Sequence, residues 1–271
     1  QYRNDHYPDV DDTAVVAMAL HRAGDPAHKP NLDRAVEWII GMQSKNGGWG
    51  AFDIDNTHYV LNNIPFADHG ALLDPPTEDV TARCISMLVQ LGHGRDHISV
   101  RRGIEFLRKS QQPDGSWFGR WGTNYVYGTW SVLCALNAAG EDMSQPYIRR
   151  AVAWLESRQR ADGGWGEDGA TYWEQRRDEC KESTASQTAW ALLGLMAAGE
   201  VESDAVRRGV QYLLAAPRNG AEWDEPWYTA VGFPRVFYLR YHGYRYYFPL
   251  WALARYRNLM KSNTRQVAHG M

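Results

Sequence analysis

The stretch Gln111-Gln112-Pro113-Asp114-Gly115-Ser116-Trp117 decides the fold of this chain, because its pattern recurs along the sequence. The same spacing of six residues from Gln to Trp returns in residues 43–49 and 159–165, each time with Gly-Gly or Gly-Ser directly before the Trp. A degenerate fourth copy ends at Trp223 and has Pro217 in the place of Gln. A motif repeated in this way is typical of a protein built from tandem structural units.

A predicted amphipathic helix precedes each of these turns. In the copy that starts at Arg102, the apolar residues Ile104, Phe106 and Leu107 have helical spacing, and the Gly-containing turn ends the helix. The other copies start at Arg34, Arg150 and Arg208. About 21 residues before each Arg begins a second, more apolar helix; these helices are expected at Thr13–Leu20, Thr81–Leu91, Thr129–Ala139 and Thr184–Ala198. The chain is therefore predicted to be a tandem array of helix pairs, with the apolar member inside and the amphipathic member outside.

Paired helices in tandem form either an open solenoid or a closed ring. Polar and aromatic residues at the starts of the apolar helices favour the ring, an all-α fold of the α/α-barrel type whose inner helices line a central cavity. We expect these four starts to meet at one mouth of the barrel: residues 9–13, 78–83, 124–130 and 182–186. The Gln and Trp side chains of the turns are predicted to be structural, with Gln binding backbone and Trp covering a helix end.

Composition excludes some classes of function. The chain has 271 residues, a net charge of −3 and a sequence pI near 6.3, so nothing indicates a nucleic-acid partner. The three cysteines Cys84, Cys134 and Cys180 lie far apart, which predicts reduced thiols in the cytoplasm.

The composition indicates contact with a membrane surface but no spanning segment. No signal peptide opens the chain, and its longest apolar run, residues 189–198, is half of the roughly 20 residues that cross a bilayer. We therefore expect no spanning segment. Twelve Trp among 13% aromatic residues nevertheless favour contact with a membrane. The chain also begins only nine residues before an acidic motif, which we interpret as a sign of a longer parent protein.

That acidic motif, Tyr7-Pro8-Asp9-Val10-Asp11-Asp12-Thr13-Ala14, predicts an acid. Repulsion and desolvation among Asp9, Asp11 and Asp12 should keep at least one carboxyl protonated at neutral pH. Two alternatives stay open: the N-terminal cap of a helix, which needs only one Asp, and a Mg²⁺ or Ca²⁺ site, although the Gly and later Glu of a calcium loop are missing.

The repeats together with this acidic motif resemble squalene-hopene cyclases, a family of class II triterpene cyclases. The resemblance continues through residues 52–56, 74–81, 117–122 and 232–249 and covers essentially the whole chain. It implies that residues 1–260 form the C-terminal α/α-barrel catalytic domain of an enzyme roughly twice as long, followed by a polar tail at 261–271. The N-terminal portion, with a second α/α-barrel, would then be absent here.

The resemblance also implies an activity. Enzymes of this family cyclise squalene, without a cofactor or metal, to the pentacyclic products hopene and hopanol through carbocations, an isomerase and hydro-lyase chemistry of bacterial hopanoid synthesis. An acid protonates a terminal alkene, which is such a poor base that the acid needs neighbours to stabilise its anion. The implied partners are squalene, one leaflet of the cell membrane reached from the cytoplasmic side as a monotopic protein, the missing N-terminal domain and, in a homodimer, a second copy.

The same resemblance assigns roles to particular residues. Asp11 would be the proton donor, with Asp9 and Asp12 tuning it. Arg83 stands where some members of the family have His and would act as a fixed positive charge, and Asp79 would join the hydrogen-bond network. From the residues alone, Asp79 and Arg83 also fit an ordinary ion pair on a helix surface.

Aromatic faces stabilise cations, so rings spaced along a cavity suit a carbocation cascade. The positions that match the family are Phe52, Trp121, Phe233, Phe237, Tyr241 and Tyr244, with Leu239 shaping the pocket and His69 where some relatives have Phe. The alternative is that these aromatic residues are ordinary members of the hydrophobic core and do not bind a substrate.

Other functions remain to be distinguished. A protein prenyltransferase β-subunit also uses an α/α-barrel but needs Zn²⁺ bound by Asp, Cys and His, and Cys180 lacks a suitably placed His. Another class II terpene cyclase, a complement-type binding barrel and an inactive isolated fragment are the further alternatives. Oxidosqualene cyclases are disfavoured, because their acidic motif carries a single Asp beside Cys.

Overall fold

The computed structural model describes residues 6–66, 72–180, 182–216, 218–220 and 222–267. Five helices belong to an inner layer: α1 (Val10–Ala23), α3 (Glu78–Gln90), α5 (Tyr125–Ala138), α7 (Ala185–Ala197) and α9 (Tyr244–Lys261). Four belong to an outer layer: α2 (Lys29–Gly41), α4 (Ile98–Ser110), α6 (Pro146–Ser157) and α8 (Asp204–Ala215). Short 3-10 helices lie between them: η1 (Pro26–His28), η2 (Tyr59–Asn63), η4 (Gly169–Tyr172) and η5 (Glu174–Arg176).

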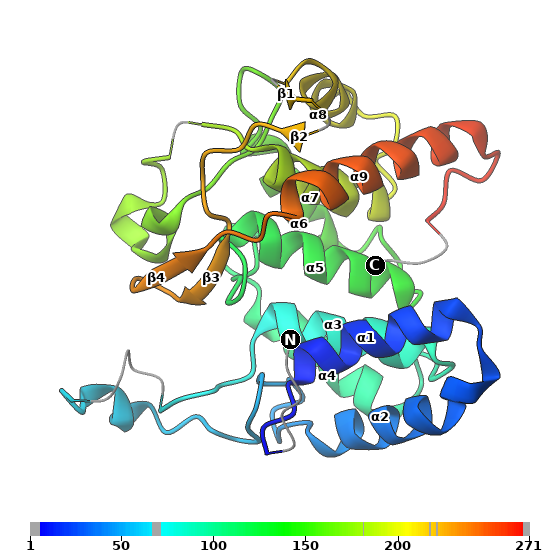
Figure 1. Ribbon diagram of the computed structural model, residues 1–271, viewed down its shortest axis with the longest axis vertical. Helices are drawn as coiled ribbons and strands as arrows, with labels where there is room; N and C mark the ends of the chain where they lie inside the picture. The colour runs from blue at the N-terminus through cyan, green and yellow to red at the C-terminus, as the bar shows by residue number, and fades with distance from the viewer. Residues whose placement is uncertain (1–5, 67–71, 181, 217, 221, 268–271) are drawn as a thin grey trace.

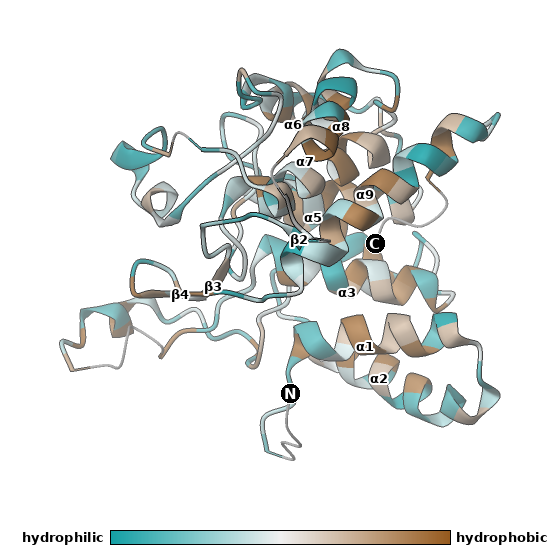
Figure 2. Ribbon diagram, turned by 45° about the horizontal axis from the view of Figure 1, so that its top comes forward, coloured by the Kyte–Doolittle hydropathy of each residue, from teal (hydrophilic) through white to brown (hydrophobic). Residues whose placement is uncertain are grey.

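The inner helices pack on one another in chain order, α1 on α3, α3 on α5, α5 on α7 and α7 on α9 (Figure 1). Each outer helix packs on an inner one, for example α2 on α1 and α8 on α7. Helices α5 and α7 are buried along nearly their whole length and are the most hydrophobic part of the ribbon in Figure 2. The predicted α/α-barrel of apolar inner and amphipathic outer helices is confirmed. Within the described ranges no extensive packing joins α9 to α1, so the barrel is open between these two helices.

The glutamines of the repeated turns connect successive outer helices. Each Nε2 donates one hydrogen bond within its own turn and a second to a carbonyl at the start of the next outer helix. Gln111, for example, donates to Gly115 O at 2.8 Å and to Tyr147 O at 2.7 Å. Gly115 has a φ of 98°, and a Cβ there would lie 2.7 Å from the Arg150 carbonyl oxygen. The turn therefore requires glycine at this position.

The tryptophans of the turns connect each outer helix to the next inner helix. Trp117 is fully buried; its indole N–H donates to Leu107 O at 2.7 Å, in the last turn of α4, and its backbone N–H donates to Thr129 Oγ1 of α5 at 3.0 Å. Trp49 and Trp165 make the corresponding bonds, and the indole of Trp223 donates to Leu213 O. The structural role predicted for these side chains is thus borne out by their hydrogen bonds.

Two antiparallel hairpins depart from the all-α prediction. Strand β1 (Arg218–Asn219) pairs with β2 (Glu222–Trp223), and β3 (Ala230–Phe233) pairs with β4 (Phe237–Leu239), with a register shift between Val231 and Phe233. A Cβ at Gly232 would lie 1.9 Å from the Phe237 ring, so the second hairpin also depends on glycine. A backbone bridge between Gly122 and Ala230 attaches β3 to the loop that precedes α5.

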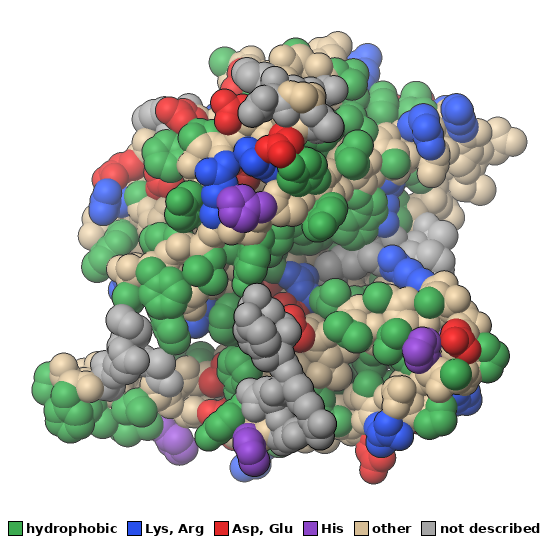
Figure 3. Space-filling view, in the orientation of Figure 1, with side chains coloured by type: hydrophobic (Ala, Val, Ile, Leu, Met, Phe, Trp, Pro, Cys, Tyr) green, Lys and Arg blue, Asp and Glu red, His purple; other side chains and the backbone are tan. Residues whose placement is uncertain are grey.

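An arm that begins after Gly50 and contains η2 extends away from the barrel (Figure 1). It exposes apolar side chains: Tyr59, Val60 and Phe66 are 62%, 72% and 87% exposed. Figure 3 shows apolar side chains gathered at the end of this arm. The three cysteines are buried free thiols. In the described part of the chain, no helix combines the length and apolarity needed to cross a membrane.

Candidate active site

The acidic motif forms the first turn of α1. Asp9 is the N-cap, since its Oδ1 accepts a hydrogen bond from Asp12 N at 2.8 Å. The capping alternative is therefore correct for Asp9, and it leaves Asp11 and Asp12 available in the first helical turn. The Asp12 side chain is exposed, whereas the Asp11 side chain is only 22% exposed.

Arg83 reaches Asp11 from the adjacent inner helix, α3. Its Nε lies 2.6 Å from Asp11 Oδ1, and Arg83 is only 7% exposed. The same guanidinium donates a hydrogen bond to the Tyr127 hydroxyl and lies over the rings of Tyr127 and Trp130, at 5.2 Å and 5.9 Å from their centroids. The alternative of an ordinary surface ion pair for Arg83 is wrong, because Arg83 is buried against α1 and α5.

Asp79 supports the site from one turn before Arg83. This residue is 1% exposed, and its Oδ2 accepts hydrogen bonds from the backbone N–H groups of Arg120 and Trp121 at 2.9 Å and 2.8 Å. Asp79 thus fixes the loop that carries Trp121 to the start of α3. Across the described residues, no group of three or more His, Cys, Asp or Glu side chains is arranged to hold a metal ion.

Burial raises the pKa of Asp11 to about 7; the charge of Arg83 opposes this shift, while the charges of Asp79, Asp9 and Asp12 add to it. Burial also raises the pKa of Asp9. Near neutral pH the protonated form of Asp11 is therefore well populated. A carboxylic acid beside a permanent cation can lose its proton to a weak base more readily than the same buried acid alone, because the guanidinium stabilises the carboxylate that remains.

A cavity of about 710 Å³ lies beside this acid, between α1 and α9. Asp9, Asp11, Asp12, Arg22 and Arg83 provide its charged part. Its aromatic lining comes from Trp121, Tyr127, Trp130, Tyr241, Tyr244, Phe248 and Trp251. Figure 3 shows acidic and basic side chains inside a hollow on this face of the molecule. The wall of a largely apolar cavity thus carries a carboxylic acid.

Three of the predicted substrate-binding residues line this cavity, namely Trp121, Tyr241 and Tyr244. Phe52 does not line it but packs edge-on against Trp121, with 6.5 Å between ring centroids. Phe233, Phe237 and Leu239 belong to the β3–β4 hairpin outside the cavity lining. The rings of Phe233 and Phe237 contact each other, with 5.4 Å between their centroids. Phe237 and Leu239 are 39% and 38% exposed. His69 lies outside the described residues.

Sequence reasoning missed four aromatic residues that line the cavity: Tyr127, Trp130, Phe248 and Trp251. Their spacing was the available signal, because each pair lies three residues apart on one inner helix. The start of α7 lies beside that of α5, since Gln187 Nε2 donates to Thr123 O at 2.8 Å, but it contributes no residue to the cavity lining. Its residue Ser186 does not line the cavity and instead donates N–H and O–H hydrogen bonds to the buried carboxylate of Glu225, at 2.8 Å and 2.7 Å.

Two solved terpene cyclases have a similar arrangement of helices. An ent-copalyl diphosphate synthase from Streptomyces platensis superposes with a TM-score of 0.62 at 24% identity, over 91% of this chain and 41% of that one. The type II terpene cyclase MstE from Scytonema gives a TM-score of 0.60 at 21% identity, over 84% and 61% of the two chains. At these identities the likeness concerns the fold alone. The chain has the α/α-barrel fold of the class II terpene cyclases.

The family is defined by sequence. Residues 1–258 match the family described as squalene-hopene cyclase C-terminal domain, and the chain belongs to it. The squalene–hopene cyclase of Bradyrhizobium diazoefficiens is 61% identical over 277 aligned positions, which include all of this chain and 42% of that relative. The chain thus spans less than half the length of this relative.

Proposed function

We propose that this chain is the acid-bearing part of a squalene-hopene cyclase, and that the complete protein converts squalene into hopene and hopanol. The observation that carries this proposal is the pairing of Asp11 with Arg83 in the wall of an aromatic cavity. We also propose that the complete protein acts as an isomerase when it forms hopene and has hydro-lyase activity that relates to hopanol.

Asp11 is the proton donor in this proposal. Its Oδ1 faces Arg83 Nε at 2.6 Å, so Oδ2 is the oxygen that holds the proton. The π electrons of the terminal alkene form the new C–H bond, and the electron pair of the broken O–H bond stays on the Asp11 carboxylate. Arg83 stabilises that anion as a fixed charge, because a guanidinium does not release a proton at neutral pH.

The aromatic lining then has two tasks. A hydrocarbon offers no group for hydrogen bonding, so the shape of the cavity must fold the substrate. As each alkene attacks the preceding cation, the ring faces of Trp121, Tyr241 and Tyr244 stabilise the positive charge without reacting with it. Loss of a proton from the last cation gives hopene, and capture of water gives hopanol.

Delivery of the substrate requires a lipid phase, because squalene is practically insoluble in water. We propose a monotopic attachment to the cytoplasmic face of the cell membrane, and a homodimer as the working form. High-salt and detergent extraction of the complete protein from membranes tests the attachment. Release by detergent alone supports apolar insertion, whereas release by salt alone contradicts it, because only charge attraction is screened by salt.

Incubation of the complete protein with squalene tests the activity, with products identified by gas chromatography and mass detection. Pentacyclic products support the proposal. Unchanged squalene beside full conversion of another polyprenoid would identify a different class II cyclase. Because the chain spans less than half of its relative, we expect the isolated 271 residues to be inactive.

A further inference from the structure

Residues 117–122 form part of the loop that precedes α5, and hydrogen bonds from two other parts of the chain fix their backbone. Asp79 accepts from this backbone on one side, as described above. On the other side the Tyr172 hydroxyl lies 2.6 Å from Gly119 O and 3.0 Å from Gly122 O, and Tyr172 is buried. These hydrogen bonds restrict the conformation of the loop, and the loop carries the cavity-lining ring of Trp121.

Arg120 is the side chain that joins this loop to the β3–β4 hairpin. Its Nη1 donates to Gly232 O at 3.0 Å, and its guanidinium lies over the Trp121 ring at 4.2 Å and over the Phe233 ring at 5.4 Å. Beside these contacts, Val231 N donates to Trp121 O at 3.1 Å. Trp121 and Val231 both line the cavity, so one cation between two rings fixes two pieces of the cavity wall relative to each other.

We propose that Arg120 is a positioning residue that sets the wall formed by Trp121 and Val231 and thereby determines how far cyclisation proceeds; this rests on the proposed function. Arg120 does not line the cavity itself, so it acts through these neighbours. If the wall is displaced, an intermediate cation is less well enclosed and loses its proton before the last ring closes. The proposal therefore concerns the distribution of products rather than the initial protonation.

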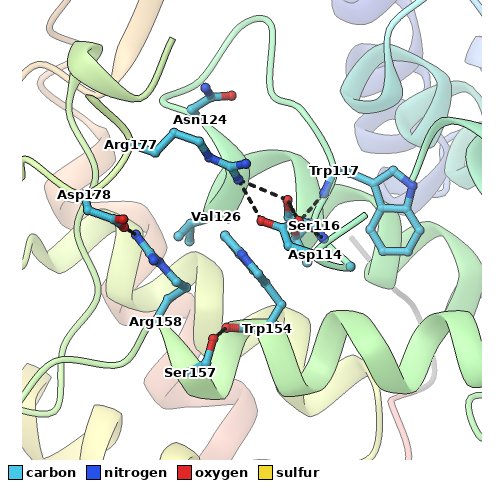
Figure 4. A network of polar contacts seen from close by, with 12 residues as sticks. Asp114, Ser116, Trp117, Asn124, Val126, Trp154, Ser157, Arg158, Arg177 and Asp178 are labelled. Atoms are coloured by element: carbon cyan, nitrogen blue, oxygen red, sulfur yellow. Dashed lines mark hydrogen bonds and ion pairs between the residues drawn. The ribbon is translucent and has the colours of Figure 1, made fainter. Parts of the chain in front are cut away.

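The control is Arg177, whose guanidinium also lies over an aromatic ring but away from the cavity. Its guanidinium lies 3.7 Å from the Tyr125 ring centroid and pairs with Asp114 Oδ2 at 2.9 Å. Figure 4 shows Arg177 directed at Asp114 and Ser116, in a network with no cavity-lining residue among those labelled.

The experiment compares the complete wild-type protein with Arg120→Met, Arg120→Lys and Arg177→Met. Squalene products are quantified, and amide hydrogen exchange is followed at Trp121 and Val231. For Arg120→Met we expect about tenfold more partially cyclised product relative to pentacyclic product, and about tenfold faster exchange at both amides. Arg120→Lys should lie between Arg120→Met and wild type, because it keeps the charge without the planar donor group, and Arg177→Met should match wild type.

A wild-type product ratio in Arg120→Met would overturn the proposal. If Arg120→Met does not fold, the same comparison with Arg120→Lys decides. If the unsubstituted protein leaves squalene unchanged, it is the proposed function that fails; unaltered exchange at Trp121 and Val231 in the Arg120 variants would then separately refute the positioning role.

Discussion

Arg83 Nε lies 2.6 Å from Asp11 Oδ1, an ion pair that joins α3 to the first turn of α1. The charge of Arg83 lowers the pKa of Asp11, against the effect of burial and of three neighbouring carboxylates. We expect Arg83→Met to raise that pKa. The alkaline limb of the pH–rate profile should then move to higher pH, while the maximal rate falls about tenfold or more because a weaker acid protonates an alkene more slowly.

The control for this profile is Arg95→Met, which removes a surface guanidinium paired with Glu141 at 3.1 Å. It should leave the profile in place. An alkaline limb that stays fixed in Arg83→Met would show that the charge of Arg83 does not act on the acid.

Replacing Asp11 by Asn removes the acidic proton and keeps the shape of the side chain. We expect Asp11→Asn to abolish cyclisation in the complete protein, a loss of at least about 10³-fold, with an unchanged circular dichroism spectrum. Residual conversion above a few per cent would exclude Asp11 as the donor. Asp9→Asn and Asp12→Asn should also be severe, because the charges of Asp9 and Asp12 act on Asp11 and members of a coupled acid group are not additive.

Glu78 makes stability depend on pH. It is 8% exposed at the start of α3, and burial raises its pKa to about 8. A carboxyl whose pKa is raised by folding stabilises the folded state while it is protonated, and this contribution is lost as pH rises from the unfolded pKa through the folded one. The free energy of unfolding should therefore decline between about pH 5 and 8, and Glu78→Gln should flatten that decline.

Urea unfolding at a series of pH values measures this effect. Glu105→Gln serves as the control, because Glu105 is a half-exposed residue of α4 that pairs with Lys109 at 3.3 Å. Parallel curves for wild type and Glu78→Gln would contradict the prediction.

Gln111 and Gln112 are adjacent, but only Gln111 joins α4 to α6 through its side chain. Gln111→Ala leaves the carbonyls of Gly115 and Tyr147 without this donor. We expect a loss of about 1–3 kcal/mol in the free energy of unfolding, since both carbonyls lie in a partly buried turn. Gln112→Ala should change stability by less than about 0.5 kcal/mol. Equal losses in the two variants would show that the glutamine bonds are not what stabilises the turn.

The helix pairs were predictable because apolar spacing and the Trp turns are local signals, but some of the inner helices start earlier than predicted. Helix α3 begins at Glu78 and α5 at Tyr125, three and four residues before the predicted Thr81 and Thr129. Periodicity marks only the buried stretch, whereas the polar first turn is helical as well. The structure also aligns Thr188, rather than Thr184, with Thr129, since Thr188 is the residue that accepts from the Trp backbone.

The site was predictable only in part. The acidic motif drew attention to Asp9, Asp11 and Asp12 together. The choice of Asp11 and of Arg83 as its fixed positive charge came from the family resemblance, because no local pattern specifies how α1 packs against α3. Likewise, the short β3–β4 hairpin has no alternation long enough to indicate strands, so the sequence could not separate Phe237 and Leu239 from the residues that line the cavity.

The hydrogen bond from each turn Trp to an inner-helix Thr suggests how this architecture diversifies in evolution. The bond spans 32 residues from Trp49 to Thr81, 12 from Trp117 to Thr129 and 23 from Trp165 to Thr188. The anchors are equivalent while the intervening lengths differ nearly threefold, and Asp79, Trp121 and Tyr172 all lie in the intervening segments. Insertions between the anchors can therefore remodel the chemistry of the site and leave the barrel that supports it undisturbed.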